Sequence, residues 1–314
     1  MNLLRSARFL RRALLPMLGA VWLAGWIVGE REAPWLWLYF IPAPVILVCG
    51  LIDLFVSRHD LRRWRTLPVL ILTALAAWKT AGFDSRWHPR RVSSPDHAIR
   101  VVHWNIARAP FGYFSMFNQL RKDRPDLVIL SESAPGDFWP NRRHSMLDLP
   151  FSFCDQGMAV LSRFAIEPQG TIPLPNARAW WARIALPDGP LDLVMCDLLS
   201  HPTLNRRAAL EPLARWVGQH DSTIPLLVVG DFNTPRDARS FEPLRAHLRH
   251  AYEIAGRGWP YTWPLPFPVY SLDHAWVSGD ITVHRYRLRT APISDHRRQV
   301  LTISIDRAPS SSPE

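Results

Sequence analysis

The first third of the chain contains three long apolar runs separated by short polar segments. Residues 13–29 include 17 positions without a charge, and residues 35–56 form a 22-residue run with Asp53 near its end. A membrane-spanning helix needs about 20 apolar residues, with about 17 as the lower limit, so both runs are predicted to cross a membrane. The third run, residues 67–78, is shorter and continues into Lys79. It spans if Lys79 reaches the interface, and it is otherwise a buried or interfacial helix.

Basic segments flank these runs. Four arginines precede the first run in RSARFLRR and four follow the second in SRHDLRRWR, whereas the loop between the two runs, EREAP, is acidic. Under the positive-inside rule both basic segments face the cytoplasm. Two spans would leave the rest of the chain inside, and three spans, which we expect, would place it outside. A cleavable signal peptide over residues 1–29 is an alternative that the second long run disfavours.

From residue 99 onward the apolar runs are short and rich in Val, Ile and Leu, as in strands covered on both faces. Strands are predicted at residues 99–106, 126–132, 158–164, 182–186, 191–199, 225–232, 272–278 and 300–305. Helices are predicted between them at residues 113–123, 204–220 and 238–250. This alternation is typical of a layered α/β domain. The predicted organisation is a membrane region at 1–83, a linker at 84–98, a soluble domain at 99–306 and a disordered tail at 307–314.

The charge of the chain is unevenly distributed. The net charge is +10, but residues 1–98 hold 13 basic against 6 acidic residues, and residues 99–314 hold 24 against 21. Most of the excess therefore belongs to the predicted membrane region. A soluble part with a net charge of only +3 is weak evidence for a nucleic-acid track, which needs many phosphate contacts.

Polar residues follow or begin several of the predicted strands. Each has an ordinary explanation as a turn or cap residue, but together they bring carboxylates, carboxamides and one imidazole to the strand ends. Oxygen ligands with a single histidine suit Mg²⁺ or Mn²⁺ better than Zn²⁺. The residues are Asn105, Glu132, Asp231, Asn233, Asp273, Asp295 and His296.

The order of these motifs resembles that of a known superfamily. HWNIA, PDLVILSES, MAVLSRF, LLVVGDFNTP, YTW, SLDHAWVS and ISDHRRQV are similar to the successive motifs of the endonuclease/exonuclease/phosphatase superfamily, over residues 99–306. GDFN with a downstream SDH is specific as a pair. Together with the apolar runs described above, the resemblance leads us to expect a bacterial-type, membrane-anchored member. It also implies a four-layered α/β sandwich, two mixed β-sheets flanked by helices, preceded here by an N-terminal transmembrane helical region.

The resemblance also implies a metal site and a set of catalytic residues. A divalent cation, Mg²⁺ or Mn²⁺, would be held by Glu132 with Asn105 nearby and Asp295 on the same side. Asp231 would orient or deprotonate the attacking water, and Asn233 would bind a nonbridging phosphate oxygen. His296 would contact the scissile phosphate, and Asp273 would orient His296. Because a phosphodiester is anionic, its hydrolysis needs such positive charge and a positioned water.

The chain departs from the family pattern at one position. Many members carry a histidine in a sequence such as NVHL, where this chain has Asp197. His201, in the following turn, either takes over that role or is a plain surface histidine. The departure leaves the protonation of the leaving group and the substrate class open.

Further residues are candidates for substrate binding. Arg178 is expected to face the cleft, and Trp263 in YTW resembles a residue of the cleft wall, although a core position is an alternative for Trp263. Arg206 and Arg207 begin a predicted helix, and a solvated helix face is the interpretation we favour for both. Four tryptophans are candidates for an apolar rim, with a core position as the commoner alternative: Trp139, Trp180, Trp181 and Trp259.

The function predicted from these features is that of a membrane-anchored, divalent-metal-dependent phosphoesterase that hydrolyses a phosphodiester or a phosphomonoester. The alternative is a catalytically inactive, membrane-tethered binding or scaffold domain of the same fold. The substrate is a nucleic acid, a lipid headgroup or a small phosphoester, and tethering favours one near the membrane. No protein partner is predicted. The expected location is the bacterial inner membrane with the soluble domain external, and the basic segment KTAGFDSRWHPRR keeps the cytoplasmic face as an alternative.

Overall fold

The computed structural model describes residues 2–30, 35–57, 63–87, 92–110, 112–133, 147–201 and 203–306. The predicted tail at residues 307–314 lies outside the described residues. The chain divides into two compact units. The first comprises Met1–Arg86, His201–Asn205 and Asp237–Arg239, and the second comprises Trp87–Ser200, Arg206–Arg236 and Ser240–Glu314.

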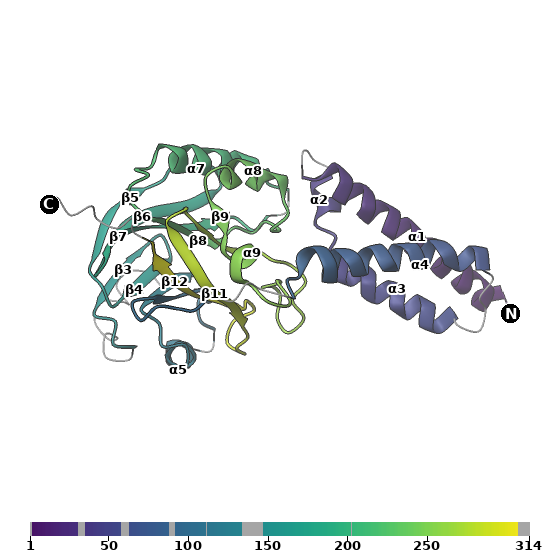
Figure 1. Cartoon of the computed structure of the whole chain (residues 1–314). Coiled ribbons are helices and arrows are strands. Elements are labelled where there is room, and N and C mark those ends of the chain that lie inside the picture. Colours follow the sequence, from purple (N-terminus) through teal and green to yellow (C-terminus); the bar gives the residue numbers. More distant parts are fainter. Residues whose placement is uncertain are drawn as a thin grey trace. The chain divides into compact units, whose positions relative to one another are not determined.

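The helices of the first unit are α1 (Asn2–Val28), α2 (Trp35–Tyr39), α3 (Ala43–Ser57), α4 (Arg63–Ala77) and the π-helix η1 (Trp78–Asp84) (Figure 1). The predicted apolar run at residues 35–56 is two helices rather than one, because Pro42 lacks an N–H and disfavours a helical residue before it. A small buried cluster of Trp22, Ala43, Ile46 and Ala76 joins α1, α3 and α4.

One helical stretch in the described part of the chain, Thr66–Asp84, is long and apolar enough to cross a membrane. Two further apolar helices, Leu14–Val28 and Ala43–Val56, are shorter. The stretch that passes this test contains the third apolar run, which is the shortest of the three in the sequence. Length and composition are weak evidence, so the number of spans stays a prediction.

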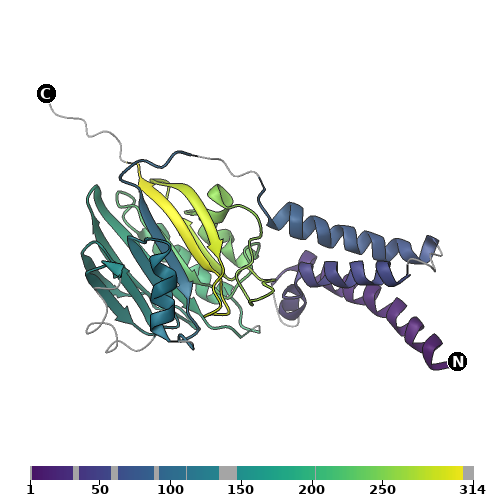
Figure 2. The same cartoon turned by 90° about the horizontal axis from the view of Figure 1, so that it is seen from below.

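The second unit contains two six-stranded sheets that face one another (Figures 1 and 2). The strand orders are β11-β12-β1-β2-β4-β3 and β5-β6-β7-β8-β10-β9. Each sheet is mixed, because β1 and β2 in the first and β7 and β8 in the second are parallel while the other pairs are antiparallel. The strands of the first sheet are β1 (Ile99–Asn105), β2 (Leu127–Ser131), β3 (Phe151–Asp155), β4 (Met158–Ser162), β11 (Ile281–Arg289) and β12 (Arg298–Ile305). Those of the second are β5 (Ile166–Thr171), β6 (Ala177–Leu186), β7 (Gly189–Leu198), β8 (Leu226–Asp231), β9 (Arg249–His250) and β10 (Asp273–Val277).

Helices cover the outer faces of the two sheets. Helix α5 (Tyr113–Arg121) packs Met116, Phe117 and Leu120 against β1 and β2. Helix α7 (Arg207–Gln219) lies against the second sheet, where Trp216 contacts Trp181 with ring centroids 5.4 Å apart. The remaining helices are η3 (Arg239–Phe241), α8 (Glu242–Arg245) and α9 (Ala251–Ala255). Two mixed sheets with flanking helices confirm the predicted α/β architecture of the soluble part.

The predicted helix at residues 238–250 is wrong at its C-terminal end. The helical segment ends at Arg245, and His250 pairs with Trp276 on the edge of the second sheet. Pairing with β10 satisfies backbone groups that an exposed last turn would leave to water. Sheet contacts therefore override the helical periodicity of this segment.

A buried ion pair on β7 gives the stability of the second unit a pH dependence. Asp192 accepts hydrogen bonds from Arg183 Nε at 2.8 Å and lies 2.8 Å from His220 Nε2. Burial alone would raise the pKa of Asp192, but these partners lower it below its usual value. Because the unfolded state then binds more protons, the stabilisation is present above the unfolded pKa of about 4 and is lost as the pH falls through the folded pKa.

We therefore expect Asp192→Asn to unfold at a lower temperature than the wild type at neutral pH, with the difference narrowing as the pH falls from about 6 to about 3. The measurement is thermal unfolding of the full chain in a mild detergent, followed by circular dichroism. Asp188→Asn, an exposed change on the same hairpin, is the control. A temperature difference that is the same at both ends of this pH range would contradict the assignment.

Candidate active site

Polar side chains replace apolar ones where strand β1 ends. Ile99 and Val101 face the core between the sheets, whereas Val102 and Trp104 face α5. Side chains alternate along a strand, so Asn105 at the end of β1 points into the space between the two sheets. It is fully buried.

The same alternation directs three carboxylates into this space from the second sheet. Asp231 on β8 is in register with Asp197 on the parallel strand β7 and with Asp273 on the antiparallel strand β10. All three side chains are at most 5% exposed. Gly230 precedes Asp231 because any Cβ at this position would lie 1.8 Å from the backbone oxygen of Cys196. The glycine of GDFN thus permits the strand approach that brings these carboxylates together.

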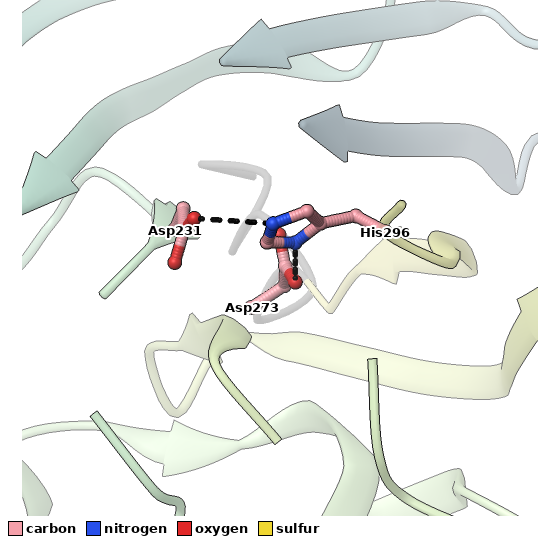
Figure 3. Close-up of side chains that lie close together, drawn as sticks. All are labelled: Asp231, Asp273 and His296. Carbon is pink, nitrogen blue, oxygen red and sulfur yellow. Dashed lines mark hydrogen bonds and ion pairs between the residues drawn. The ribbon is translucent and has the colours of Figure 1, made fainter. Parts of the chain in front are cut away.

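His296 lies between two of these carboxylates (Figure 3). Its Nδ1 is 2.8 Å from Asp273 Oδ2, and its Nε2 is 3.9 Å from Asp231 Oδ2. The loop before β12 is held in place by Ser294, whose hydroxyl donates to the backbone oxygen of Asn105 and accepts from the backbone N–H of His296. The three side chains of Figure 3 form one buried group at the ends of β8, β10 and the loop before β12.

The charges of this group depend on one another. Burial alone would lower the pKa of His296, but attraction by Asp273 and the hydrogen bond to it raise this pKa to about 10. Burial alone would raise the pKa of Asp273, whereas His296 lowers it. Burial and the neighbouring Asp273 carboxylate raise the pKa of Asp231 to about 7. His296 is therefore a cation at neutral pH, and the pKa of Asp231 is matched to accepting a proton there.

Asn105 links this group to Glu132. Its Nδ2 donates to Glu132 Oε1 at 3.0 Å and to Asp231 Oδ2 at 2.9 Å, and its Oδ1 accepts from the backbone N–H of Ala107. Glu132 directly follows β2 with a φ of 50°, in the left-handed region that few residues adopt. Such a conformation at a strand end is a frequent feature of functional sites.

The side chains at this point fit a divalent cation. The Asn105 amide N–H stands between two carboxylates, at a position that favours positive charge. The donors are carboxylate and carboxamide oxygens, which Mg²⁺ and Mn²⁺ prefer. Asp273 Oδ1 is also buried and has no hydrogen-bond partner in the described part of the chain.

A second grouping of potential ligands overlaps the first. Ligand atoms of Asp231, Asp273 and His296 lie within 4.8 Å of one another. A protonated His296 cannot donate an electron pair to a metal, and its hydrogen bond to Asp273 stabilises the proton. The oxygen-rich side around Glu132 and Asn105 is therefore the better location for a cation.

The third predicted metal residue, Asp295, accepts a hydrogen bond from another part of the site. Asp295 is exposed, and its Oδ2 accepts a hydrogen bond from Trp263 Nε1 at 2.8 Å. No hydrogen bond or ion pair in the described part of the chain joins Asp295 to Glu132 or Asn105. The Trp263 ring lies 6.4 Å from the His296 ring and is half-buried, as expected of a cleft wall. The role of Asp295 at a metal stays a prediction.

Asn233 is held by the backbone around it. Its φ is 46°, its N–H donates to Asp231 Oδ1, and its Nδ2 donates to the backbone oxygen of Leu198 at 2.7 Å. Arg206 Nε donates to the backbone oxygen of Asn233. Arg206 is only 2% exposed, so the predicted solvated helix face is wrong for this residue, because its guanidinium turns inward to the strand end. Arg207 is exposed and pairs with Glu211, as predicted.

An ion pair occupies the position of the family histidine. Arg178 on β6 is in register with Asp197 and forms a salt bridge with it, and Arg178 Nη1 also donates to the backbone oxygen of Gln156. Burial raises the pKa of Asp197 to about 6 although Arg178 opposes this. His201 lies on an exposed loop of the other compact unit, with its Nδ1 2.7 Å from Thr203 Oγ1. Whether His201 replaces the family histidine stays untested.

The tryptophans of the predicted apolar rim have different environments. Trp180 is 1% exposed and belongs to the core between the sheets, so it is not part of a rim. Trp181 packs against Trp216 on the outer face of the second sheet. Trp259 is 37% exposed, and Trp139 lies outside the described residues.

His103 is a buried neighbour of the site that motif reasoning missed. Its Nδ1 accepts from Gln299 Nε2 and lies 3.8 Å from Asp273 Oδ1, while its Nε2 is 3.0 Å from Ser131 Oγ. Desolvation lowers the pKa of His103 to about 4, so it is neutral. Its position in the sequence could have identified it, because a residue two positions before Asn105 lies on the same face of β1.

Sequence and structure comparisons give consistent relatives. A family model described as "Endonuclease/Exonuclease/phosphatase family" matches residues 102–296. The uncharacterized protein YbhP of Escherichia coli K12 is 34% identical over 131 residues, which are 39% of this chain and 51% of YbhP. The chain thus spans about half the length of the curated relatives it matches.

Similar solved structures share the fold at low identity. An endonuclease/exonuclease/phosphatase from Beutenbergia cavernae has a TM-score of 0.54 at 19% identity, over 68% of this chain and 73% of that chain. The human nocturnin catalytic domain with bound sulfate has a TM-score of 0.53 at 19% identity, over 72% and 98%. TDP2 from D. rerio, complexed with single strand DNA product, has a TM-score of 0.53 at 16% identity, over 67% and 100%.

Proposed function

The chain belongs to the endonuclease/exonuclease/phosphatase family, and on that premise we propose that it hydrolyses a phosphate ester with the help of a divalent cation. The observation that carries this proposal is the buried Asp273–His296 pair facing Asp231, with Glu132 and Asn105 beside it. The protonated His296, a base whose pKa is matched to neutral pH and an oxygen-rich position for a metal each contribute to metal-assisted phosphoester hydrolysis.

The geometry supports a division of roles in this reaction. Asp231 accepts a proton from the attacking water as the water oxygen bonds to phosphorus and the bond to the leaving group breaks. His296 presents Nε2–H to a phosphate oxygen, and Asp273 keeps its ring charged and oriented. Asn233 is placed next to Asp231 to contact a nonbridging oxygen. Mg²⁺ or Mn²⁺, held at Glu132 and Asn105, would supply further positive charge to the phosphate.

The helical unit supports membrane anchoring as a part of the proposal. Besides the stretch Thr66–Asp84, helices α1 and α3 carry large apolar side chains that are more than half exposed, among them Leu14, Met17, Ile27, Leu51 and Phe55. Soluble proteins rarely expose so many. The proposed location is the bacterial inner membrane with the catalytic unit external, and the cytoplasmic face is the alternative. The substrate is a nucleic acid, a lipid headgroup or a small phosphoester, and no protein partner is proposed.

Metal removal gives a direct test. The purified full chain in mild detergent is expected to hydrolyse bis-p-nitrophenyl phosphate or p-nitrophenyl phosphate, to lose this activity in EDTA and to regain it with excess Mg²⁺ or Mn²⁺. Glu132→Gln should lower kcat/KM at least about a hundredfold and raise the metal concentration needed for half-activation. Glu211→Gln, an exposed change on α7, is the matched control. Activity that survives EDTA would contradict the metal assignment, and so would a Glu132→Gln variant with the same kcat/KM as the wild type.

A further inference from the structure

A loop of 17 residues, 256–272, joins α9 to β10 (Figure 1). Residues 264–269, PLPFPV, are six consecutive positions without a polar side chain. Phe267 is 82% exposed, the highest value of any large apolar side chain in the described part of the chain, the apolar helices included. A contiguous run of apolar side chains that reaches the surface, unlike a single exposed residue, can mark an interaction site.

This apolar loop, defined here as residues 263–270, is closed and stiff. Trp263 and Tyr270 exchange backbone hydrogen bonds in both directions, at 3.0 and 2.8 Å. Every second residue from 264 to 268 is proline, whose ring fixes φ. The exposed side chains therefore need little further ordering when they meet a partner, which lowers the entropic cost of binding.

The apolar loop is attached directly to the candidate active site. Leu265 N–H donates to the backbone oxygen of Asp295 at 2.7 Å, and Trp263 Nε1 donates to the Asp295 carboxylate. Asp295 precedes His296 in the chain. A partner bound by the tip of the loop would thus lie next to the residues that act on phosphate.

Four arginines gather near the base of the apolar loop: Arg257, Arg285, Arg287 and Arg289. The pKa of Arg287 is lowered by the like charges of the other three, which places them within electrostatic reach of one another. Arg289 pairs with Asp123, but no ion pair among the described residues joins the other three to an acid. Arg297 connects this arginine patch to the loop, since it donates to the backbone oxygens of Trp259, Tyr261 and Leu288.

We propose that the apolar loop and the arginine patch dock the catalytic unit on the surface of an anionic lipid bilayer. Phe267 enters the interfacial layer with Leu265 and Val269 beside it, and the exposed arginines contact the headgroups. If the catalytic unit docks in this way, the substrate is a phosphoester carried by a lipid, an inference that rests on the proposed function. A nucleic-acid strand fits less well, because the tip has no side-chain donor or acceptor for a base edge and the second unit has little net basic charge.

The test uses the full chain with its three cysteines replaced by alanine and a single new cysteine for an environment-sensitive fluorophore. Phe267→Cys carries the probe at the loop tip. Gln169→Cys is the control, because it lies exposed on β5, at the opposite edge of the sheet from β10. The chain is reconstituted in vesicles of phosphatidylcholine and phosphatidylglycerol that contain a lipid-borne quencher.

We expect the probe at position 267 to be quenched in these vesicles and the probe at 169 to remain as in detergent. Adding Arg285→Glu and Arg287→Glu, or high salt, should lower the vesicle-docked fraction at least about tenfold. Equal quenching at positions 267 and 169 would overturn the docking surface. A probe at 267 that responds to a single-stranded oligonucleotide and not to vesicles would also overturn it, in favour of a nucleic-acid surface.

Activity assays separate this proposal from the proposed function. Phe267→Ser should keep its turnover of soluble bis-p-nitrophenyl phosphate and lose at least about tenfold against phosphoesters presented in vesicles. Equal loss on both substrates would contradict docking, since it would indicate damage to the site. Quenching at position 267 in a chain that hydrolyses no ester would support the docking surface and refute the proposed function.

Discussion

His296→Ala is expected to lower kcat/KM for a soluble phosphodiester at least about a thousandfold, with the fold unchanged. The change removes a buried cation whose Nε2 faces Asp231 and whose Nδ1 is bonded to Asp273. It also leaves two buried carboxylates near one another without the positive charge between them. Both effects raise the barrier for attack on an anionic phosphate.

The controls for His296→Ala separate charge from orientation. Asp273→Asn keeps a hydrogen-bonding side chain beside the ring but removes the anion that raises the pKa of His296, so the loss should approach that of His296→Ala at high pH. His97→Ala, an exposed change in the segment before β1, should leave the rate as it is. Circular dichroism and thermal unfolding verify the fold. Wild-type kcat/KM in a folded His296→Ala chain would refute the assignment.

His201→Ala decides a question that the departure from the family pattern raises. If His201 replaces the histidine that Asp197 displaces, its loss should lower kcat most for esters with a poor leaving group, because such oxygens need a proton. Equal effects on good and poor leaving groups would assign it no part in protonation.

Asp123→Ala is expected to lower the free energy of unfolding of the second unit by about 3–5 kcal/mol. Asp123 is 1% exposed and binds two arginines, Arg298 through Nε and Arg289 through Nη1. Arg298 is itself 2% exposed. Removal of the carboxylate would therefore leave a buried guanidinium without its counter-ion, which costs far more than an exposed pair does.

The effect of Asp123→Ala should extend toward the active site. Arg298 lies over the Trp104 ring, 5.3 Å from its centroid, and Trp104 Nε1 donates to the backbone oxygen of His296. Denaturant unfolding of the full chain in mild detergent, followed by near-ultraviolet circular dichroism, gives the free energy.

Two further variants test whether the loss of stability comes from the buried Arg298 guanidinium left without its counter-ion. Arg289→Ala should cost no more than about 1 kcal/mol, because the side chain of Arg289 is 39% exposed. The double change Asp123→Leu with Arg298→Met should recover most of the stability, because it removes both buried charges together. A loss below about 1 kcal/mol in Asp123→Ala would show that water or another group solvates Arg298.

Much of the soluble architecture was predictable because it depends on local pattern. Each of the eight predicted strands overlaps one strand of the two sheets, and the predicted helices at 113–123 and 204–220 correspond to α5 and α7. The four strands missed are the four edge strands of the two sheets, and they carry exposed or charged side chains: β3, β5, β9 and β11. Edge strands lack the continuous apolar run that marks a covered strand.

The sequence by itself determined which residues stand at the strand ends and on which face. Asn105, Asp231 and Asp273 each continue the period-two alternation of a core strand, so a strand assignment directs all three into the space between the sheets. The order of the motifs then indicated the family. The strand-end positions are local properties, since each depends on residues within one strand, and the order of the motifs is read directly along the chain.

Only the tertiary structure decided which of these groups act on one another. Three contacts join residues that are far apart in the chain: Asp273 with His296, Arg206 with Asn233, and Arg178 with Asp197. The exposure of Phe267 likewise depends on how the chain packs around it. Charge and pKa depend on distance and burial, and neither can be read from spacing along a sequence. The apolar run at 35–56 is a different case, because the residue that divides it between two helices, Pro42, is visible in the sequence itself.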